Sequence, residues 1–213
     1  MKKDIVILGA SGFATDLLWV LEDNITDGEK WNFLGFVDRF ATGASVDGYP
    51  ILGDDNWLLS YPHEISVLCG LGFPATRRRV AAQFLNRPNI HFPPLISCTA
   101  QLSRHSSIGN GSVLCHGVRV APNVKIGCFS MLNLNVTIGH DSVLQDYIMV
   151  NPGTNISGNV TIADGCDIGT GVRIIPGKHI GADTVIGAGS VIIRDIPGNC
   201  TVVGNPGRIL EKK

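Results

Sequence analysis

Aliphatic residues recur at every sixth position along the C-terminal half of the chain, without a miss. Neither an α-helix, with apolar positions every three to four residues, nor an ordinary strand of period two produces this spacing. A period of six is the signature of a parallel β-helix, in which each hexapeptide forms one side of a coil. The series comprises Leu102, Ile108, Leu114, Val120, Ile126, Leu132, Ile138, Leu144, Val150, Ile156, Ile162, Ile168, Ile174, Ile180, Ile186 and Ile192.

A second column accompanies the first. The residue four positions after each aliphatic is mostly small or β-branched, as at Ser112, Val136 and Ser142, and we expect it to point inward as well. Three hexapeptides close one coil, so the series predicts about five coils. No insertion breaks the sixfold phase, so no long loop should project from the coils.

The N-terminal part has a different pattern, in which short apolar runs alternate with segments of helical spacing. This alternation predicts a small parallel α/β sheet. We therefore expect an α/β domain over residues 1–96 and a β-helix with a C-terminal cap over 97–213, the boundary following Pro93-Pro94. The expected strands are 4–10, 33–38, 65–70 and 89–92, the expected helices 11–24, 54–58 and 75–86, and turn signals fill 39–53.

Composition restricts the functional classes. The 213 residues are 44% apolar with a formal net charge of −1, which argues against a general role at nucleic acids or membrane surfaces. No apolar run is long enough to span a bilayer, and we expect a cytoplasmic protein. The six cysteines form no C-x-x-C pair and are expected to be reduced. His105, His116 and His179 lie at different phases of the repeat, so we expect surface or corner residues and no metal site.

Three motifs in phase with the repeat connect this architecture with a chemistry. They are 132–141 (LNLNVTIGHD), 156–160 (ISGNV) and the two closing segments 186–197 and 203–209. Together with the N-terminal domain, they resemble the left-handed β-helix, hexapeptide-repeat sugar acetyltransferases. The branch they resemble contains sialic-acid O-acetyltransferases and nucleotide-4-amino-sugar N-acetyltransferases. The resemblance implies a homotrimer that binds acetyl-CoA in the cleft between neighbouring β-helices.

The same resemblance assigns catalytic roles. His140 corresponds to the general base, and a neutral imidazole suits proton removal near working pH. Asp141 corresponds to the acidic neighbour that orients the histidine. Asn133 matches a position that contacts the substrate or the histidine, although an asparagine capping a coil corner is an equal alternative.

Five positions are candidates for coenzyme A. Gly158, one coil after His140, matches a place where bare backbone admits the pantetheine arm or the acetyl group, although it could equally be an ordinary corner glycine. Gly187 and Ala188 form a glycine-rich corner, and Arg208 could bind a phosphate bidentately. Met149 stands where some relatives have a second histidine that contacts the acetyl group, so this contact must differ here.

The N-terminal turn predicts a binding site of its own. Gly9, Ser11 and Gly12 follow a strand and open a helix, where α/β sheets bind phosphates. The spacing is G-x-x-G, which argues against a dinucleotide. In similar enzymes this turn and the acid after the second strand, here Asp38, hold the nucleotide of a nucleotide sugar. Phe13-Ala14 replace the His-Gly frequent in the family, and a domain retained only as a cap is the alternative.

The resulting hypothesis is an acetyl-CoA-dependent N-acetyltransferase that acts on a nucleotide-linked amino sugar by direct attack. Sugar O-acetylation of the sialic-acid type is the alternative within the class. Serine acetylation fits less well, because the N-terminal domain reads as α/β. A non-catalytic trimeric scaffold and a zinc-dependent β-helix enzyme of the carbonic-anhydrase kind are the alternatives from other classes.

Overall fold

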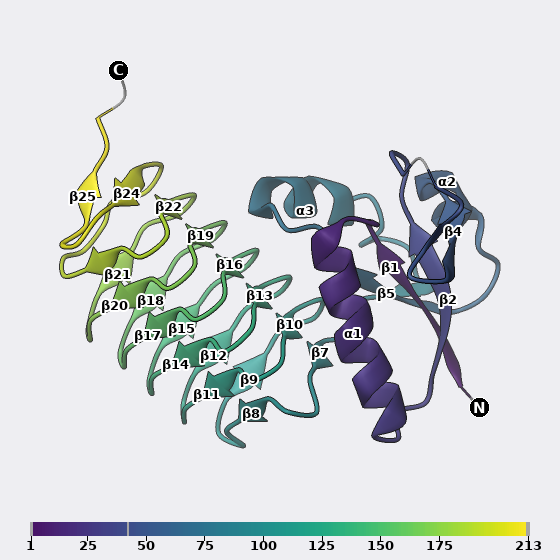
Figure 1. Ribbon diagram of the computed structural model, residues 1–213, viewed down its shortest axis with the longest axis horizontal. Helices are drawn as coiled ribbons and strands as arrows, with labels where there is room; N and C mark the ends of the chain where they lie inside the picture. Colours follow the sequence, from purple (N-terminus) through teal and green to yellow (C-terminus); the bar gives the residue numbers. More distant parts are fainter. Residues whose placement is uncertain (1, 42, 212–213) are drawn as a thin grey trace.

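The computed structural model describes residues 2–41 and 43–211, which form an α/β domain followed by a β-helix (Figure 1). The α/β domain is built on a six-stranded sheet of order β3-β4-β2-β1-β5-β6, parallel except for β3. Its strands are β1 (Lys3–Leu8), β2 (Trp31–Val37), β3 (Ser45–Val46), β4 (Tyr49–Gly53), β5 (Ile65–Cys69) and β6 (Ile90–His91). Its helices are α1 (Gly12–Thr26), α2 (Asp55–Ser60) and α3 (Pro74–Ala81).

The central strand β1 shows why the apolar runs become parallel strands. Ile5, Val6 and Ile7 are fully buried, since helices cover a parallel sheet on both faces. The expected turn region 39–53 was partly wrong, because it contains the edge strand β3 and its neighbour β4, which pairs with β2. The expected helix over 75–86 is shorter, ending at Ala81. Among the described residues no helix is long and apolar enough to cross a bilayer.

The β-helix has three flat faces, each a parallel sheet of short strands. The first face contains β7 (Leu95–Ile96), β10 (Val113–Leu114), β13 (Met131–Leu132), β16 (Met149–Val150), β19 (Asp167–Ile168), β22 (Val185–Ile186) and β24 (Thr201–Val203), with antiparallel β25 (Arg208–Ile209) at its end. The second face contains β8 (Gln101–Leu102), β11 (Arg119–Val120), β14 (Thr137–Ile138), β17 (Asn155–Ile156), β20 (Arg173–Ile174) and β23 (Val191–Ile192). The third face contains β9 (Ser107–Ile108), β12 (Lys125–Ile126), β15 (Val143–Leu144), β18 (Thr161–Ile162) and β21 (His179–Ile180).

Each strand pairs with its counterpart in the next coil, three hexapeptides later, as in Arg119 with Thr137. The β-helix begins at Leu95, slightly before the aliphatic series, because β7 already pairs with β10. The first-face strands from β7 to β22 follow one another at intervals of one coil, and β24 comes after them. The stack is therefore slightly longer than the five coils predicted.

Buried hydroxyls connect successive coils inside the prism. The Ser130 side chain is fully buried, donates to the Gln145 carbonyl (2.9 Å) and accepts from the Ile148 amide (3.1 Å). The Ser112 hydroxyl makes the equivalent bonds one coil earlier, donating to the Gly127 carbonyl and accepting from Ser130 N. A small polar residue therefore fits this internal column, since each buried hydroxyl has both a donor and an acceptor as partners.

The α/β domain covers the first face of the β-helix. The outward residues Val113, Met131 and Met149 are at most 7% exposed and belong to the same apolar cluster as the domain core. Arg77 of α3 is fully buried at this junction. Its guanidinium donates to carbonyl groups of the Leu71–Gly72 turn and of two β-helix corners, at Phe129 and Ile148. Burial lowers the pKa of Arg77 to about 10, which leaves it charged at neutral pH.

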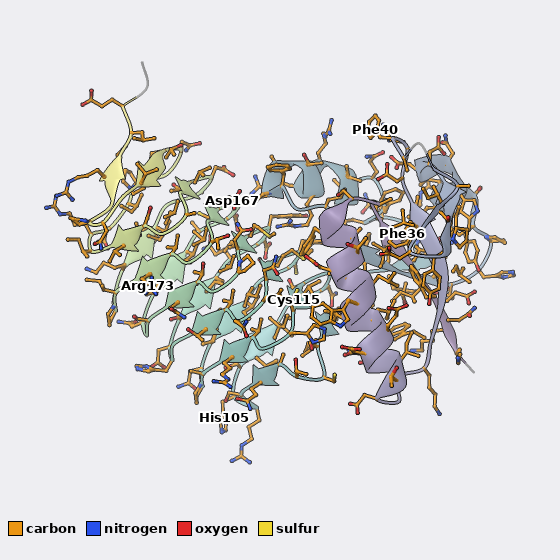
Figure 2. The ribbon with its side chains drawn as sticks, viewed as in Figure 1. Phe36, Phe40, His105, Cys115, Asp167 and Arg173 are labelled. Carbon is orange, nitrogen blue, oxygen red and sulfur yellow. The ribbon has the colours of Figure 1, made fainter. Side chains whose placement is uncertain are left out.

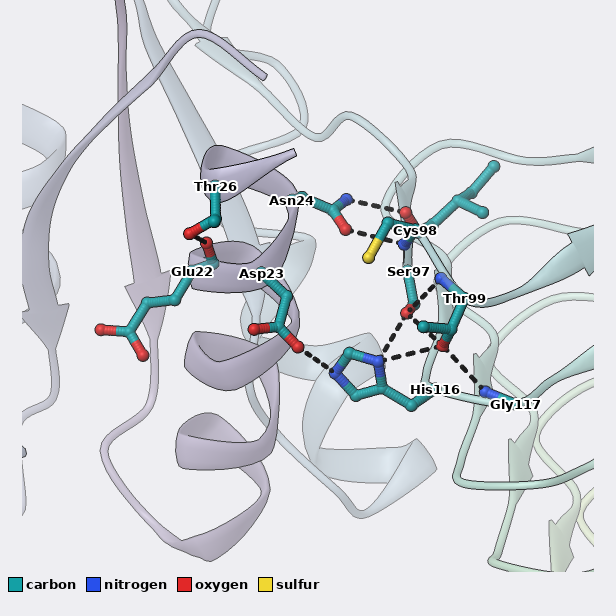
Figure 3. A network of polar contacts seen from close by, with 10 residues as sticks. Glu22, Asp23, Asn24, Thr26, Ser97, Cys98, Thr99, His116 and Gly117 are labelled. Carbon is teal, nitrogen blue, oxygen red and sulfur yellow. Dashed lines mark hydrogen bonds and ion pairs between the residues drawn. The ribbon is translucent and has the colours of Figure 1, made fainter. Parts of the chain in front are cut away.

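Helix α1 binds the first coil through a polar network (Figure 3). The Asn24 amide donates to the Ile96 carbonyl (2.7 Å) and accepts from Cys98 N (2.9 Å). His116 Nδ1 lies 2.7 Å from Ser97 Oγ, and its Nε2 lies 3.4 Å from an Asp23 carboxylate oxygen. His116 is thus a corner residue, as expected, but its side chain is only 12% exposed because α1 covers it.

Candidate active site

His140 and Asp141 lie on the turn that leads from the second to the third face, after β14. The His140 side chain is 68% exposed, and its Nδ1 lies 2.7 Å from Asp141 Oδ2. Asp141 has φ near +59°, which turns the chain at this corner. The other carboxylate oxygen, Oδ1, accepts from the side-chain amide of Asn123 (3.0 Å), one coil earlier.

This pairing determines which imidazole nitrogen is a base. An ionised carboxylate only accepts hydrogen bonds, so the proton of a neutral His140 must be on Nδ1, and Nε2 keeps a free lone pair. The hydrogen bond from His140, followed by that from Asn123, lowers the pKa of Asp141 and favours its ionised form. The arrangement can remove a proton from a group placed near Nε2.

Gly158 lies directly against the imidazole. A Cβ added at Gly158 would be 2.8 Å from His140 Nε2 and 2.9 Å from Cε1, closer than such atoms approach. The space above this backbone is therefore occupied by the histidine ring. A contact of Gly158 with coenzyme A stays a prediction, whereas its contact with His140 is a feature of the fold.

Three further candidates lie on another edge, between the first and second faces. Asn133 is 6% exposed, and its side-chain oxygen accepts from Leu134 N (2.7 Å), as expected of a corner cap. Gly187 lies against β24, since a Cβ there would be 2.8 Å from Val203 Cγ1, and Ala188 is exposed beside it. Within one chain the structure does not bring these residues together with His140.

Met149 and Arg208 belong to the first face. Met149 pairs with Met131 and Asp167 and is 7% exposed beneath the α/β domain, so in one chain it faces the domain junction. Arg208 in β25 is exposed, and its guanidinium donates to its own neighbour, the Gly207 carbonyl.

Asp38 joins the two N-terminal loops predicted to bind the nucleotide. Its carboxylate accepts from the backbone amides of Ala10 (2.8 Å) and Phe40 (2.7 Å). A cavity of about 220 Å³ on one side is lined by Gly9, Asp38 and Phe40, with Arg79 and Gln83 of the α3 region. A second cavity of about 380 Å³ includes Ser11 and Asp38.

The surroundings of Gly12 and Phe40 suit a ligand at the α1 N-terminus. A Cβ at Gly12 would meet nothing within 4 Å, and the Ser11 side chain makes no capping hydrogen bond. The Phe40 ring is 83% exposed at the cavity mouth. Nothing in the sequence pattern distinguishes Phe40 or Arg79, because only the folded sheet brings the end of β2 and the α3 region to one cavity.

In a single chain, the His140 edge and the predicted nucleotide site at Asp38 lie on different sides of the molecule. The chain visits the three faces in order, so the edge that carries His140 lies opposite the first face. The α/β domain covers that first face. In Figure 2, His105, two coils before Asp141 in the same column, lies at the lower edge, while Phe40 lies at the upper edge.

One other cluster of polar side chains resembles a catalytic site. Ser97, His116 and Asp23 nevertheless differ from a Ser-His-Asp triad. Ser97 is only 2% exposed, and it contacts Nδ1 of the histidine while Asp23 lies near Nε2, the reverse of the arrangement in a triad. In residues 2–41 and 43–211, no group of three histidine, cysteine or acidic side chains could hold a metal ion.

The α/β domain matches a known family. Residues 4–84 match the PglD N-terminal domain. Over 97% of its length the chain is similar to GDP-perosamine N-acetyltransferase of Escherichia coli O157:H7, at 27% identity and with 96% of that protein covered. Serine acetyltransferase of Synechococcus elongatus is 30% identical over 68% of the chain, which spans only 59% of that relative.

Two solved structures share the whole architecture. The acetyltransferase domain of PglB from Neisseria gonorrhoeae, in complex with acetyl coenzyme A, has a TM-score of 0.90 at 29% identity, with 99% of this chain and 100% of that chain covered. A histidine-to-asparagine mutant of perosamine N-acetyltransferase from Caulobacter crescentus, in complex with CoA and GDP-perosamine, has a TM-score of 0.89 at 27% identity, with 98% and 97% covered. The resemblance to hexapeptide-repeat sugar acetyltransferases is thereby confirmed.

Proposed function

We propose that this chain is an acyltransferase that transfers an acetyl group from acetyl-CoA to the amine of a nucleotide-linked amino sugar. The proposal is supported by its similarity, over nearly its whole length, to sugar N-acetyltransferases of the hexapeptide-repeat kind. The supporting observation is the His140–Asp141 pair on an exposed edge, in which Asp141 pairs with Nδ1 and Nε2 has no hydrogen-bond partner among the described residues. We expect the reaction to take place in the cytoplasm.

The chemistry follows from the orientation of His140. The sugar amine attacks the thioester carbonyl while Nε2 removes its proton, and the tetrahedral intermediate collapses with loss of the CoA thiolate. Asp141 stabilises the imidazolium that forms. The attack is direct, so no acetyl-enzyme is formed. General-base catalysis of this kind contributes about 10²–10⁴-fold in rate.

A homotrimer would complete this site. In one chain His140 and Gly158 lie on the edge opposite the α/β domain, while Gly187 and Ala188 lie on another edge. A cleft between neighbouring copies could unite these two edges around one acetyl-CoA molecule. Ile175 and Ile193 support packing of the His140 edge, because they follow the second-face strands at its turns and are 37% and 39% exposed.

The α/β domain would bind the nucleotide. The cavities on either side of Asp38, the α1 N-terminus at Ser11 and Gly12, and the close approach of Gly9 to the Gly70 carbonyl form a recess for a phosphorylated ligand. Arg79 at the cavity provides a positive charge toward phosphate.

The decisive experiment measures CoA release from acetyl-CoA with a panel of nucleotide amino sugars, free sialic acid and serine. We expect turnover with a nucleotide amino sugar, and a loss of about 10²–10⁴-fold in kcat for His140→Ala with acetyl-CoA binding retained. Light scattering should give the mass of three chains.

Turnover with sialic acid or serine alone would replace the proposed substrate class. Binding of ligands without any turnover would favour the trimeric scaffold. Full activity of the His140→Ala variant would reject His140 as the base.

A further inference from the structure

Asn123 is the one side chain from a neighbouring coil that is hydrogen-bonded to the His140–Asp141 pair among the described residues. It lies on the turn before β12, one coil before Asp141, with φ near +64°. Its amide donates to Asp141 Oδ1 (3.0 Å) while Asp141 Oδ2 pairs with His140 Nδ1 (2.7 Å). Each oxygen of the Asp141 carboxylate therefore has its own partner.

We infer that Asn123 is a positioning residue for the acetyl transfer. It orients the Asp141 carboxylate, so that Asp141 in turn keeps the proton of His140 on Nδ1 and directs Nε2 toward the acceptor. The inference rests on the proposed function, in which His140 is the general base.

The exposure of the pair explains why such a residue is needed. The His140 and Asp141 side chains are 68% and 52% exposed, so water competes for both carboxylate oxygens. An exposed pair on its own has little preference for one geometry. A second hydrogen bond from the adjacent coil stops rotation of the carboxylate about χ2, because both of its oxygens are then fixed.

The coil geometry supports this assignment. Asn123 and Asp141 occupy equivalent corner positions of successive coils, both with left-handed backbone, so their side chains extend from the same place one coil apart. Asparagine is among the residues that tolerate this conformation. Arg104 and His105 lie on the same edge two coils before His140 and Asp141, and neither forms an ion pair with Asp141 in the described structure.

The test compares Asn123→Gly with Asn123→Asp. Glycine removes the donor and tolerates the backbone, so kcat should fall about tenfold with little change in KM for acetyl-CoA, the effect of one hydrogen bond to a charged group. Aspartate has the same shape but adds a negative charge beside Asp141. It should shift the acid limb of the kcat/KM profile to higher pH, because a nearby anion favours the imidazolium.

The matched controls are Asn199→Gly and Asn199→Asp. Asn199 is an exposed corner asparagine with φ near +58° on another edge, so these variants reproduce the backbone change without touching the pair. We expect kcat and the pH profile to stay as in the wild type.

A second measurement is independent of turnover. Nitrogen-15 NMR of the neutral His140 imidazole should show the Nδ1-protonated tautomer in the wild type and a mixture of tautomers in Asn123→Gly. An unchanged tautomer together with kcat within about twofold of the wild type would overturn the role of Asn123. If His140→Ala keeps full activity, His140 is not the general base, and the positioning role of Asn123 is rejected together with it.

Discussion

The His140 imidazole has two chemically different neighbours, a carboxylate at Nδ1 and bare backbone at Nε2. The carboxylate selects the tautomer, and the absence of a side chain at Gly158 leaves room for the ring. Each neighbour comes from a different position in the repeat, one adjacent in sequence and one a full coil later. The regular spacing of the coils therefore assembles the site.

Substitution of Gly158 by alanine tests whether the imidazole must lie against the Gly158 backbone for catalysis. The new Cβ would lie 2.8 Å from Nε2, so the ring must rotate away from its position. We expect kcat to fall about 10²-fold, as is typical when a reacting group is displaced by roughly 1 Å, with unchanged thermal stability. Gly72→Ala is the control, since a Cβ there meets nothing within 4 Å. Wild-type turnover of Gly158→Ala would show that the His140 imidazole does not need its position against Gly158 to act as the base.

At the scale of the elements, two-residue strands are too short to be stable alone, and their stability comes from stacking. Aliphatic side chains such as Ile138, Ile156 and Ile174 form one column inside the prism, each at most 2% exposed. Buried hydroxyls form part of the other column. The period of six made the first column evident in the sequence, and the small residues indicated the second. The bonds of those hydroxyls to the next coil required the structure.

Ser130→Ala tests the contribution of the buried hydroxyls that connect successive coils. The change removes two hydrogen bonds and leaves the buried Ile148 amide with one partner fewer, so the free energy of unfolding should fall by about 1–3 kcal/mol. Urea unfolding would measure it. The exposed serine Ser107, changed to alanine, is expected to stay within about 0.5 kcal/mol of the wild type. Equal effects of Ser130→Ala and Ser107→Ala would mean that the buried hydroxyl bonds between coils add no stability.

At the scale of the whole molecule, one buried side chain connects the two domains. The Arg77 guanidinium binds carbonyl groups of both the α/β domain and the β-helix. Its positive charge also acts to lower the pKa of Asp167 on the first face. Nothing in the pattern around 77 distinguished this arginine from Arg78 and Arg79, because burial depends on which face of α3 meets the β-helix.

The pH dependence of stability should report on this junction. Burial raises the pKa of Asp167, while hydrogen bonding to Asn151 and the charge of Arg77 oppose the rise. A raised folded-state pKa means that the ionised carboxylate weakens the fold above that value, and that the penalty disappears as pH falls to the ordinary range of an aspartate, about 4.

Asp167→Asn should therefore increase the free energy of unfolding at neutral pH, and the difference from the wild type should shrink as pH falls toward about 4. Urea titrations at several pH values would measure the difference, with the exposed Asp27→Asn as the control. Lower stability of Asp167→Asn at neutral pH would show that attraction to Arg77 exceeds the cost of burial.

The sequence alone determined the coil architecture and the domain order, because side chains repeating at every sixth position leave one way to bury an aliphatic column. It also placed His140 beside Asp141, since the two are adjacent in the chain. The spacing of the repeat also put Gly158 one coil after His140, but only the tertiary structure shows that its backbone lies against the imidazole and that Asn123 donates to Asp141. The α/β domain likewise covers the face opposite His140 because α3 and the first-face strands share one apolar interface. Such contacts depend on three-dimensional packing, for which a linear pattern has no signal.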